Sequence, residues 1–376
     1  MKQLWKIFVC LYCVYFTACK EPYQPQVTTV NANILVVEGF ISTNTDSTVM
    51  TLSRTVLLND KNTTKPELNA SVWVENDANA SYPLKDLGKG LYGANGLNLD
   101  ATKKHRIKIK TVKGSTYVSD FVETKISPPI DDINFDVRDD GIQLYVNTHD
   151  DTQKSRYYRW EYYETWEFNS KYSSLLKVVG NQLVERQFPA DDIYTCYASS
   201  KSTNVFLNST VRLDKDVVYK GSLNFIPKGS EKISNRFTTL VTQYVLTKEA
   251  YEFWEKMKKN TESLGSIFDA QPSQLTGNIH NVDNAEEPVI GFISAGTMVK
   301  RRVFFERSVL PNWLTIYPYG CAIDTVKDDA TRQGLFNGSI TPIDIVKSDK
   351  GSYPRASTPQ CVDCTIRGSH KKPSFW

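Results

Sequence analysis

Cysteine is the residue type in this chain whose positions most directly suggest chemistry, because a thiol can pair, bind a metal or react as a redox centre. Four cysteines lie in the C-terminal half of the 376 residues: Cys196, Cys321, Cys361 and Cys364. An even number of thiols in an exported chain is typical of a disulfide framework. We expect one bridge between Cys361 and Cys364. We expect the second between Cys196 and Cys321, although spacing does not fix the connectivity.

The motif Cys361-Val362-Asp363-Cys364 has two other interpretations. A redox site would need a βαβ context and the start of a helix, whereas Pro359 precedes the motif and Gly368 follows it in a turn-rich tail. A zinc site would need a second cysteine pair, and His370 is the one additional ligand nearby. A structural disulfide is the favoured interpretation, and we expect no metal or other cofactor.

The N-terminus carries the features of an export signal. Lys2 and Lys6 precede an apolar run from Ile7 to Phe16, which is too short for the roughly 20 residues that span a bilayer. The run ends at Phe16-Thr17-Ala18-Cys19, which resembles the lipobox of bacterial lipoproteins, although Phe16 stands where Leu or Val is usual. We expect a signal peptide over 1–18, lipid on Cys19 and a tether over 19–32. The alternative is an ordinary secretory signal with a chance cysteine.

Catalytic motifs are missing from the sequence. There is no nucleophile elbow, zincin helix motif, P-loop or dinucleotide fingerprint. Four adjacent pairs of aspartates lie in turn-like settings, where the two side chains point in different directions: Asp131-Asp132, Asp139-Asp140, Asp191-Asp192 and Asp328-Asp329. His105 and His149 are isolated in sequence. We expect a protein that is not an enzyme, although glutamates on neighbouring strands could still form a glycosidase site.

Composition narrows the class of partner. The chain has 45 Lys and Arg against 42 Asp and Glu, a net charge of +3, which is too small for the basic field of a nucleic-acid binder. Aromatic residues make up 12% of the chain, whereas disordered proteins contain few of them. We therefore expect a folded protein with no nucleic-acid partner.

Aromatic side chains are the candidate contacts for a ligand or partner. Trp160, Tyr162 and Trp166 fall on one face of a long expected strand, and Phe375 and Trp376 end the chain. Such a stripe could be a platform for carbohydrate. It is more often the core face of a sheet, so packing is the commoner role for each of these residues.

Alternating short strands must position these residues. The strands expected in the first part of the chain run from Ile34 to Ile41, Thr48 to Arg54, Ser71 to Asn76, Gly90 to Ala94, His105 to Val112 and Tyr117 to Val122. This spacing predicts an Ig-like or transthyretin-like β-sandwich over 33–127. Ser127-Pro128-Pro129 marks the boundary to a larger β-rich domain over 128–376, whose first hairpin turns at Arg138 to Gly141.

One amphipathic helix interrupts the second domain near 248–262. Thr247 can cap it, Glu249 lies in its first turn, and Ala250, Phe253 and Trp254 contribute to an apolar face. Several lysines near its C-terminal end complement the helix dipole. The mainly β fold therefore contains a single expected helix.

Several short segments resemble a family of Bacteroidota lipoproteins, domain of unknown function 4249. The segments are Leu35 to Gly39, Gly90 to Tyr92, Glu249 to Trp254, Gly265 to Asp269, Gln271 to Ser273, Gly277 to Ile279, Cys361 to Cys364 and Pro373 to Trp376. The resemblance carries over no catalytic residues. It implies an outer-membrane setting, commonly beside genes for TonB-dependent transporters.

Two functions follow as expectations. The first is a lipid-anchored outer-membrane protein that acts as a non-catalytic accessory or ligand-capture subunit of a TonB-dependent transporter. The second is a structural or adhesive lipoprotein of the cell surface with no transport role. Both need a rigid β scaffold with loops free for recognition.

Overall fold

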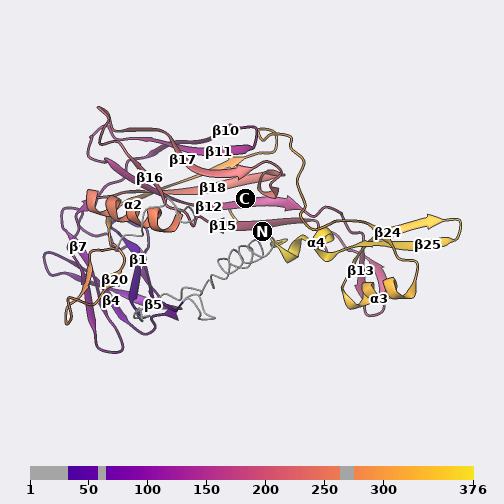
Figure 1. The fold of residues 1–376 in the computed structure, drawn as a ribbon, viewed down its shortest axis with the longest axis horizontal. Coiled ribbons are helices and arrows are strands. Elements are labelled where there is room, and N and C mark those ends of the chain that lie inside the picture. The colour runs from indigo at the N-terminus through magenta and orange to yellow at the C-terminus, as the bar shows by residue number, and fades with distance from the viewer. Residues whose placement is uncertain (1–32, 58–64, 263–274) are drawn as a thin grey trace, which may run out of the picture.

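The computed structural model describes residues 33–57, 65–262 and 275–376. Strands dominate these residues, which confirms the expectation of a mainly β protein. They form an N-terminal unit, a central unit beside it and a C-terminal lobe that projects from the central unit (Figure 1). The expected signal peptide over 1–18 and the expected lipid attachment and tether over 19–32 lie outside the described residues.

The N-terminal unit is a curled sheet built from twelve of the described strands. Its main path runs β19-β8-β7-β4-β5-β6-β2-β1-β21-β9, with β20 beside β1 and β3 beside β2. The strands are β1 (Leu35–Ser42), β2 (Thr48–Arg54), β3 (Lys65–Pro66), β4 (Ser71–Asn76), β5 (Ser81–Gly88), β6 (Leu91–Ala94), β7 (His105–Lys110), β8 (Thr116–Ser119), β9 (Thr124–Lys125), β19 (Ile279–Asn281), β20 (Val289–Ile290) and β21 (Ala295–Gly296). Alternate residues such as Met50, Leu52, Val72 and Ile107 point into one core, because successive side chains of a strand face opposite ways.

Strand β5 was not expected from the sequence. Its pattern is weak because Leu84 is its one buried residue, and Pro83 reduces the strand signal. The strand nevertheless pairs with β4 on one side and β6 on the other, so it joins the two halves of the curled sheet.

The last three strands of the N-terminal unit come from late in the chain. β20 and β21 pair in parallel with β1, and β19 pairs with β8. The Asn278 side chain fixes this returning segment, because its Nδ2 donates to Ile293 O at 2.9 Å and its Oδ1 accepts from Ile293 N at 2.8 Å. The division at 127/128 therefore does not follow the strand pairing, since 279–296 complete the first unit.

The central unit contains a three-stranded sheet in the order β10-β11-β17 and a five-stranded sheet, β15-β12-β18-β22 with β16 beside β12. The strands are β10 (Ile130–Val137), β11 (Gly141–His149), β12 (Tyr157–Asn169), β15 (Thr195–Lys201), β16 (Phe206–Ser209), β17 (Val217–Pro227), β18 (Arg236–Val245) and β22 (Met298–Phe305). Ile142 and Ile226 of the first sheet share a buried core with Trp160 and Phe168 of the second. A short 3₁₀ turn, Glu231–Ile233, leads into β18. The hairpin expected at Arg138 to Gly141 is present, closed by Arg138 N donating to Gly141 O at 2.8 Å.

Helix α2 (Lys248–Glu262) forms where the sequence predicts it. Thr247 Oγ1 accepts a hydrogen bond from Ala250 N at 3.2 Å, which satisfies one of the free N–H groups of the first turn. Ala250 and Phe253 are buried. The helix lies between the N-terminal and central units (Figure 1), where its apolar face shares a cluster with Phe40 of β1 and Tyr244 of β18. None of the helices in the described ranges is long and apolar enough to cross a membrane.

The C-terminal lobe consists of the hairpin β13 (Leu176–Val179) and β14 (Gln182–Glu185) together with β23 (Asp324–Thr325), α3 (Asp329–Asn337), β24 (Thr341–Ser348) and β25 (Gly351–Ser357). Its own core is small, with Val326, Leu335 and Ala356 buried. Helix α3 was not expected. Its signals are a cap from Asp328, whose Oδ1 accepts from Thr331 N at 2.8 Å, and Gly338 in a left-handed conformation after the last turn.

Candidate binding cleft

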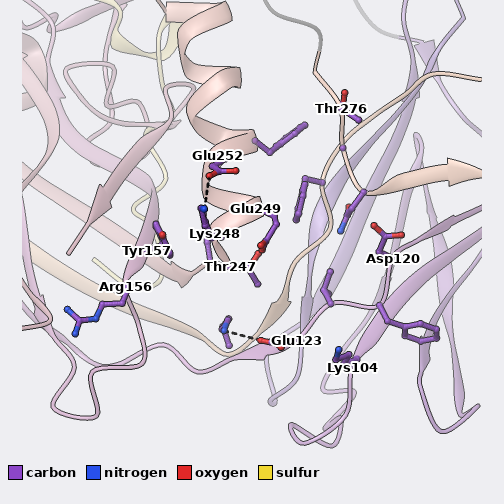
Figure 2. Close-up of a pocket in the computed structure, with 18 of the residues that line it drawn as sticks. Lys104, Asp120, Glu123, Arg156, Tyr157, Thr247, Lys248, Glu249, Glu252 and Thr276 are labelled. Carbon is purple, nitrogen blue, oxygen red and sulfur yellow. Dashed lines mark hydrogen bonds and ion pairs between the residues drawn. The ribbon is translucent and has the colours of Figure 1, made fainter. Parts of the chain in front are cut away.

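A cleft of about 730 Å³ opens where the two units and α2 meet (Figure 2). Its walls come from separate parts of the chain. The N-terminal unit contributes Lys104 and residues 120–125, the central unit residues 154–157, and the returning segment residues 276–278. Concave sites of this size at domain junctions are where small ligands usually bind.

Helix α2 presents one face to the cleft. Glu249, Glu252, Phe253 and Lys256 all line it, and this spacing places them on one side of an α-helix. The pKa of Glu249 lies below its usual value, because its carboxylate accepts a hydrogen bond from its own backbone N–H and interacts with Thr247. Glu252 lies 3.7 Å from Lys248 Nζ (Figure 2).

Aromatic and aliphatic side chains form the apolar part of the lining. Phe253 and Leu246 are buried, and the Phe253 ring lies 5.5 Å from that of Phe292. Tyr157 packs against Tyr251 on the same helix, with 5.0 Å between ring centroids. Phe121 is 38% exposed, so part of its ring is free for contact.

The segment that connects the two units beside the cleft is fixed by hydrogen bonds from β18. Gln243 Nε2 donates to Pro128 O at 2.8 Å, and Ser127 Oγ accepts from Val245 N at 3.1 Å. Ser127 Oγ also donates to Thr297 O at 2.9 Å. The Ser127-Pro128-Pro129 segment is thus a hydrogen-bonded connection in which Ser127 is buried.

A second hollow of about 680 Å³ adjoins the cleft. Lys125 and Lys154 line both, so the two hollows meet at these residues. In the second hollow, the hydrogen bond between His149 Nδ1 and Asp131 Oδ2, 2.7 Å long, raises the pKa of His149. Burial alone would raise the pKa of Asp150, but hydrogen bonds from Thr152 and Ser155 hold it at about 2.

The aromatic stripe on β12 does not reach either hollow. Trp160 and Trp166 are 1% and 8% exposed and belong to the core of the central unit, and Tyr162 packs against that core. The face of β12 that carries them packs against the three-stranded sheet, so Trp160 and Trp166 have the packing role that was expected as the commoner one, and their candidate role as surface contacts is wrong. Trp160 instead supports the junction, since its Nε1 donates to Gln243 Oε1 at 2.9 Å.

Phe375 and Trp376 lie on the outer side of the five-stranded sheet. The Trp376 ring is 5.3 Å from that of Tyr197, and the Arg302 guanidinium lies 3.8 Å from the centre of the Phe375 ring. Phe375 remains 40% exposed, whereas Trp376 is half-buried. Neither lines the cleft.

The four cysteines form two disulfides, but the expected pairing is wrong. Cys196 pairs with Cys364, and Cys321 pairs with Cys361. The reason is the conformation of the tail. Cys361 lies in α4 (Pro359–Val362) beside Tyr319, whereas Cys364 begins a 3₁₀ turn (Cys364–Ile366) and joins the core of the central unit. With each thiol bonded elsewhere, Cys361 and Cys364 do not form a redox or zinc motif.

Several of the aspartates singled out in the sequence have local structural partners. Asp131 accepts from His149, Asp191 lies 2.5 Å from Lys177 Nζ, and Asp328 caps α3. His105 is fully buried, which lowers its pKa. Glu164, on the core face of β12, is 2% exposed at its side chain and pairs with Lys232. Across the described ranges no three His, Cys, Asp or Glu side chains gather as a metal site would require.

Sequence reasoning did not identify the cleft. Its walls combine residues near 104, 123, 155, 250 and 277, and each segment by itself is an ordinary polar loop or helix face. The single usable signal was the amphipathic pattern of α2, which has charged residues at 249, 252 and 256 beside the buried Phe253.

Comparison with curated proteins finds no significant match to this chain. Residues 20–302 match the family model described as a domain of unknown function (DUF4249), which confirms the family resemblance. The Cys361 to Cys364 motif and the last four residues lie beyond the matched range. Because the match spans most of the sequence, the chain belongs to the DUF4249 family.

Proposed function

We propose that this protein is a lipid-anchored, non-catalytic accessory subunit of the outer membrane, which captures a solute and passes it to a TonB-dependent transporter. The observation that supports it most is the cleft between the two units. It has the size of a ligand site, and its walls are positioned by a hydrogen-bonded connection.

The groups that line the cleft fit binding better than acid–base catalysis. Glu123 lies 3.2 Å from Lys125 and Glu252 lies 3.7 Å from Lys248. Glu249 is engaged at the helix start, where its pKa is lowered. A general acid needs a carboxyl whose pKa is raised towards neutrality, whereas the pKa of Glu249 is lowered.

The lipid anchor follows from the sequence around Cys19. Each buried methylene of an acyl chain contributes about 0.8 kcal/mol, so several chains hold a protein at a membrane essentially permanently. A tether of about a dozen residues would then keep the two units near a membrane partner at a millimolar effective concentration. Weak contacts would suffice for a stable complex.

Affinity purification of the full-length protein from membranes solubilised in mild detergent tests the proposal. We expect a TonB-dependent β-barrel to be recovered in near-stoichiometric amount. A Cys19→Ala variant is the matched control: it should lose both labelling by an alkyne fatty acid and the barrel. Recovery of the protein alone, with unchanged nutrient uptake in a deletion strain, would favour the structural or adhesive role.

A further inference from the structure

The charges that line the cleft do not balance. Six basic side chains line it: Lys104, Lys125, Lys154, Arg156, Lys248 and Lys256. Four acidic side chains line it: Asp120, Glu123, Glu249 and Glu252. The cleft therefore carries an excess of positive charge, although the whole chain is nearly neutral.

The acidic side chains are already engaged within the protein. Two of them pair with Lys125 and Lys248, and Glu249 serves the start of α2. Asp120 lies 3.9 Å from His280 Nδ1. Two of the six basic groups are thus paired and four have no carboxylate partner, while the charges of Glu249 and Asp120 remain, so the net excess of the lining is +2.

These four cations have no carboxylate partner in the part of the chain that the structure describes. Lys104, Lys154 and Lys256 form no ion pair there, and all three are exposed. Arg156 is half-buried, and its guanidinium donates to the carbonyl oxygens of Thr210 and Leu213 at 3.2 Å each. Figure 2 shows this guanidinium directed away from the other labelled residues of the lining, so Lys104, Lys154 and Lys256 are the unpaired cations that an occupant can use.

The position of Lys154 also bears on the size of the ligand, because this lysine lies where the two hollows meet. An occupant that reaches this lysine can extend into both. The partly exposed ring of Phe121 and the ring of Tyr157 offer apolar surface for the carbon skeleton of such an occupant.

We propose that the cleft binds an organic anion that carries several carboxylate, sulfate or phosphate groups, with Lys104, Lys154 and Lys256 supplying the positive charge. This inference rests on the proposed function, whose captured solute it assigns to a chemical class. Surface charge pairs are individually weak, so recognition requires several anionic groups on one molecule.

Isothermal titration of the full-length protein in mild detergent tests this inference with two matched pairs of probes. Trigalacturonate is compared with maltotriose, and inositol hexakisphosphate with myo-inositol, so that each pair differs chiefly in charge. We expect at least one anion to bind at least tenfold more tightly than its neutral counterpart, with an affinity that falls as salt is added. The pair that responds distinguishes a carboxylated glycan from a phosphorylated solute.

A triple variant, Lys104→Gln with Lys154→Gln and Lys256→Gln, should weaken binding of that anion about tenfold or more. The control is Lys113→Gln with Lys215→Gln and Lys350→Gln, which removes the same charge at exposed lysines outside both hollows and should bind as the wild type does. Equal affinity for charged and neutral probes, or equal weakening in both variants, would overturn the inference. A barrel recovered with the protein despite that result would leave the accessory role intact.

Discussion

The junction between the N-terminal and central units is built differently from the base of the C-terminal lobe. At the junction, Gln243, Ser127 and the apolar cluster around α2 are buried, and they connect segments far apart in sequence. At the lobe, the buried apolar clusters are small, with Val326, Leu335 and Ala356 in one and Ile343 in another, and two disulfides tie the adjoining tail to the rest of the protein. A part too small to bury much apolar surface depends on covalent links, whereas a large interface does not.

Removing the disulfides should produce the largest effect. In the chain-entropy model the bridge between Cys196 and Cys364, separated by 168 residues, contributes about 5 kcal/mol, and that between Cys321 and Cys361, separated by 40, about 4 kcal/mol. We expect Cys321→Ala with Cys361→Ala to expose β24 and β25 to hydrogen exchange while the N-terminal unit stays protected. Exchange that rises equally in the N-terminal unit would remove the distinction between the two kinds of connection.

Replacing Gln243 with alanine should destabilise the junction between the N-terminal and central units. Gln243 is fully buried, and its removal leaves the Trp160 N–H and the Pro128 carbonyl without partners. Two unsatisfied buried groups at about 1–3 kcal/mol each predict a loss of about 3 kcal/mol, measured by urea unfolding. Gln182→Ala, on an exposed strand of the lobe, is the control and should change the free energy of unfolding by less than about 0.5 kcal/mol. Similar losses in both variants would contradict the prediction.

A smaller effect is expected from Asp150, which orders the loop that carries Lys154. Its carboxylate accepts hydrogen bonds from Thr152 N at 2.9 Å and Ser155 N at 2.9 Å. Hydrogen bonds hold its pKa at about 2 against an ordinary value of 3.8, so the charged form contributes about 2 kcal/mol to stability. The pKa of Asp150 is lower in the folded protein than in the unfolded chain. This contribution to stability is therefore complete at pH values above the ordinary pKa of 3.8 and is lost as pH falls through about 2.

Asp150→Asn should therefore lower the free energy of unfolding by about 2 kcal/mol at neutral pH. This difference from the wild type should shrink as pH falls from about 4 to about 2. The comparison is made by chemical unfolding across this range. Asp151→Asn is the matched control, since the Asp151 side chain is 94% exposed and should tolerate the change. A difference that stays constant with pH would mean that the carboxylate charge is not the cause.

Local signals explain which elements were predictable from the sequence. Helix α2 has a threonine cap and an apolar face, and β2 and β4 alternate cleanly, so each was found with nearly correct bounds. Strands β20 and β21 pair with β1, which lies far away in the sequence, and no local pattern records that pairing, although residues 289–294 have the pattern of a strand. The same limit applies to the disulfides, since their connectivity depends on where α4 places Cys361.

The aromatic stripe on β12 shows why the candidate contact residues were harder to predict than the strands. Alternation on β12 correctly placed Trp160, Tyr162 and Trp166 on one face, but it could not tell whether that face meets solvent or another sheet. For the lysines of the cleft the difficulty is the reverse, because no pattern in the sequence singles them out. Each has the sequence context of an ordinary surface residue. They line one cleft because the fold brings three distant segments together.

The returning segment has a consequence for how the protein folds. Strand β1 emerges first from the ribosome, but its parallel partners β20 and β21 are made much later, after the whole of β10 to β18 and α2. Contacts of such high sequence separation form slowly, because a long loop must close before they stabilise anything. The N-terminal unit therefore cannot finish folding independently while the chain is being synthesised. Its open edge beside β1 must stay protected from aggregation until residues 279–296 arrive, so the unit whose strands are made first stays open until most of the central unit has been made.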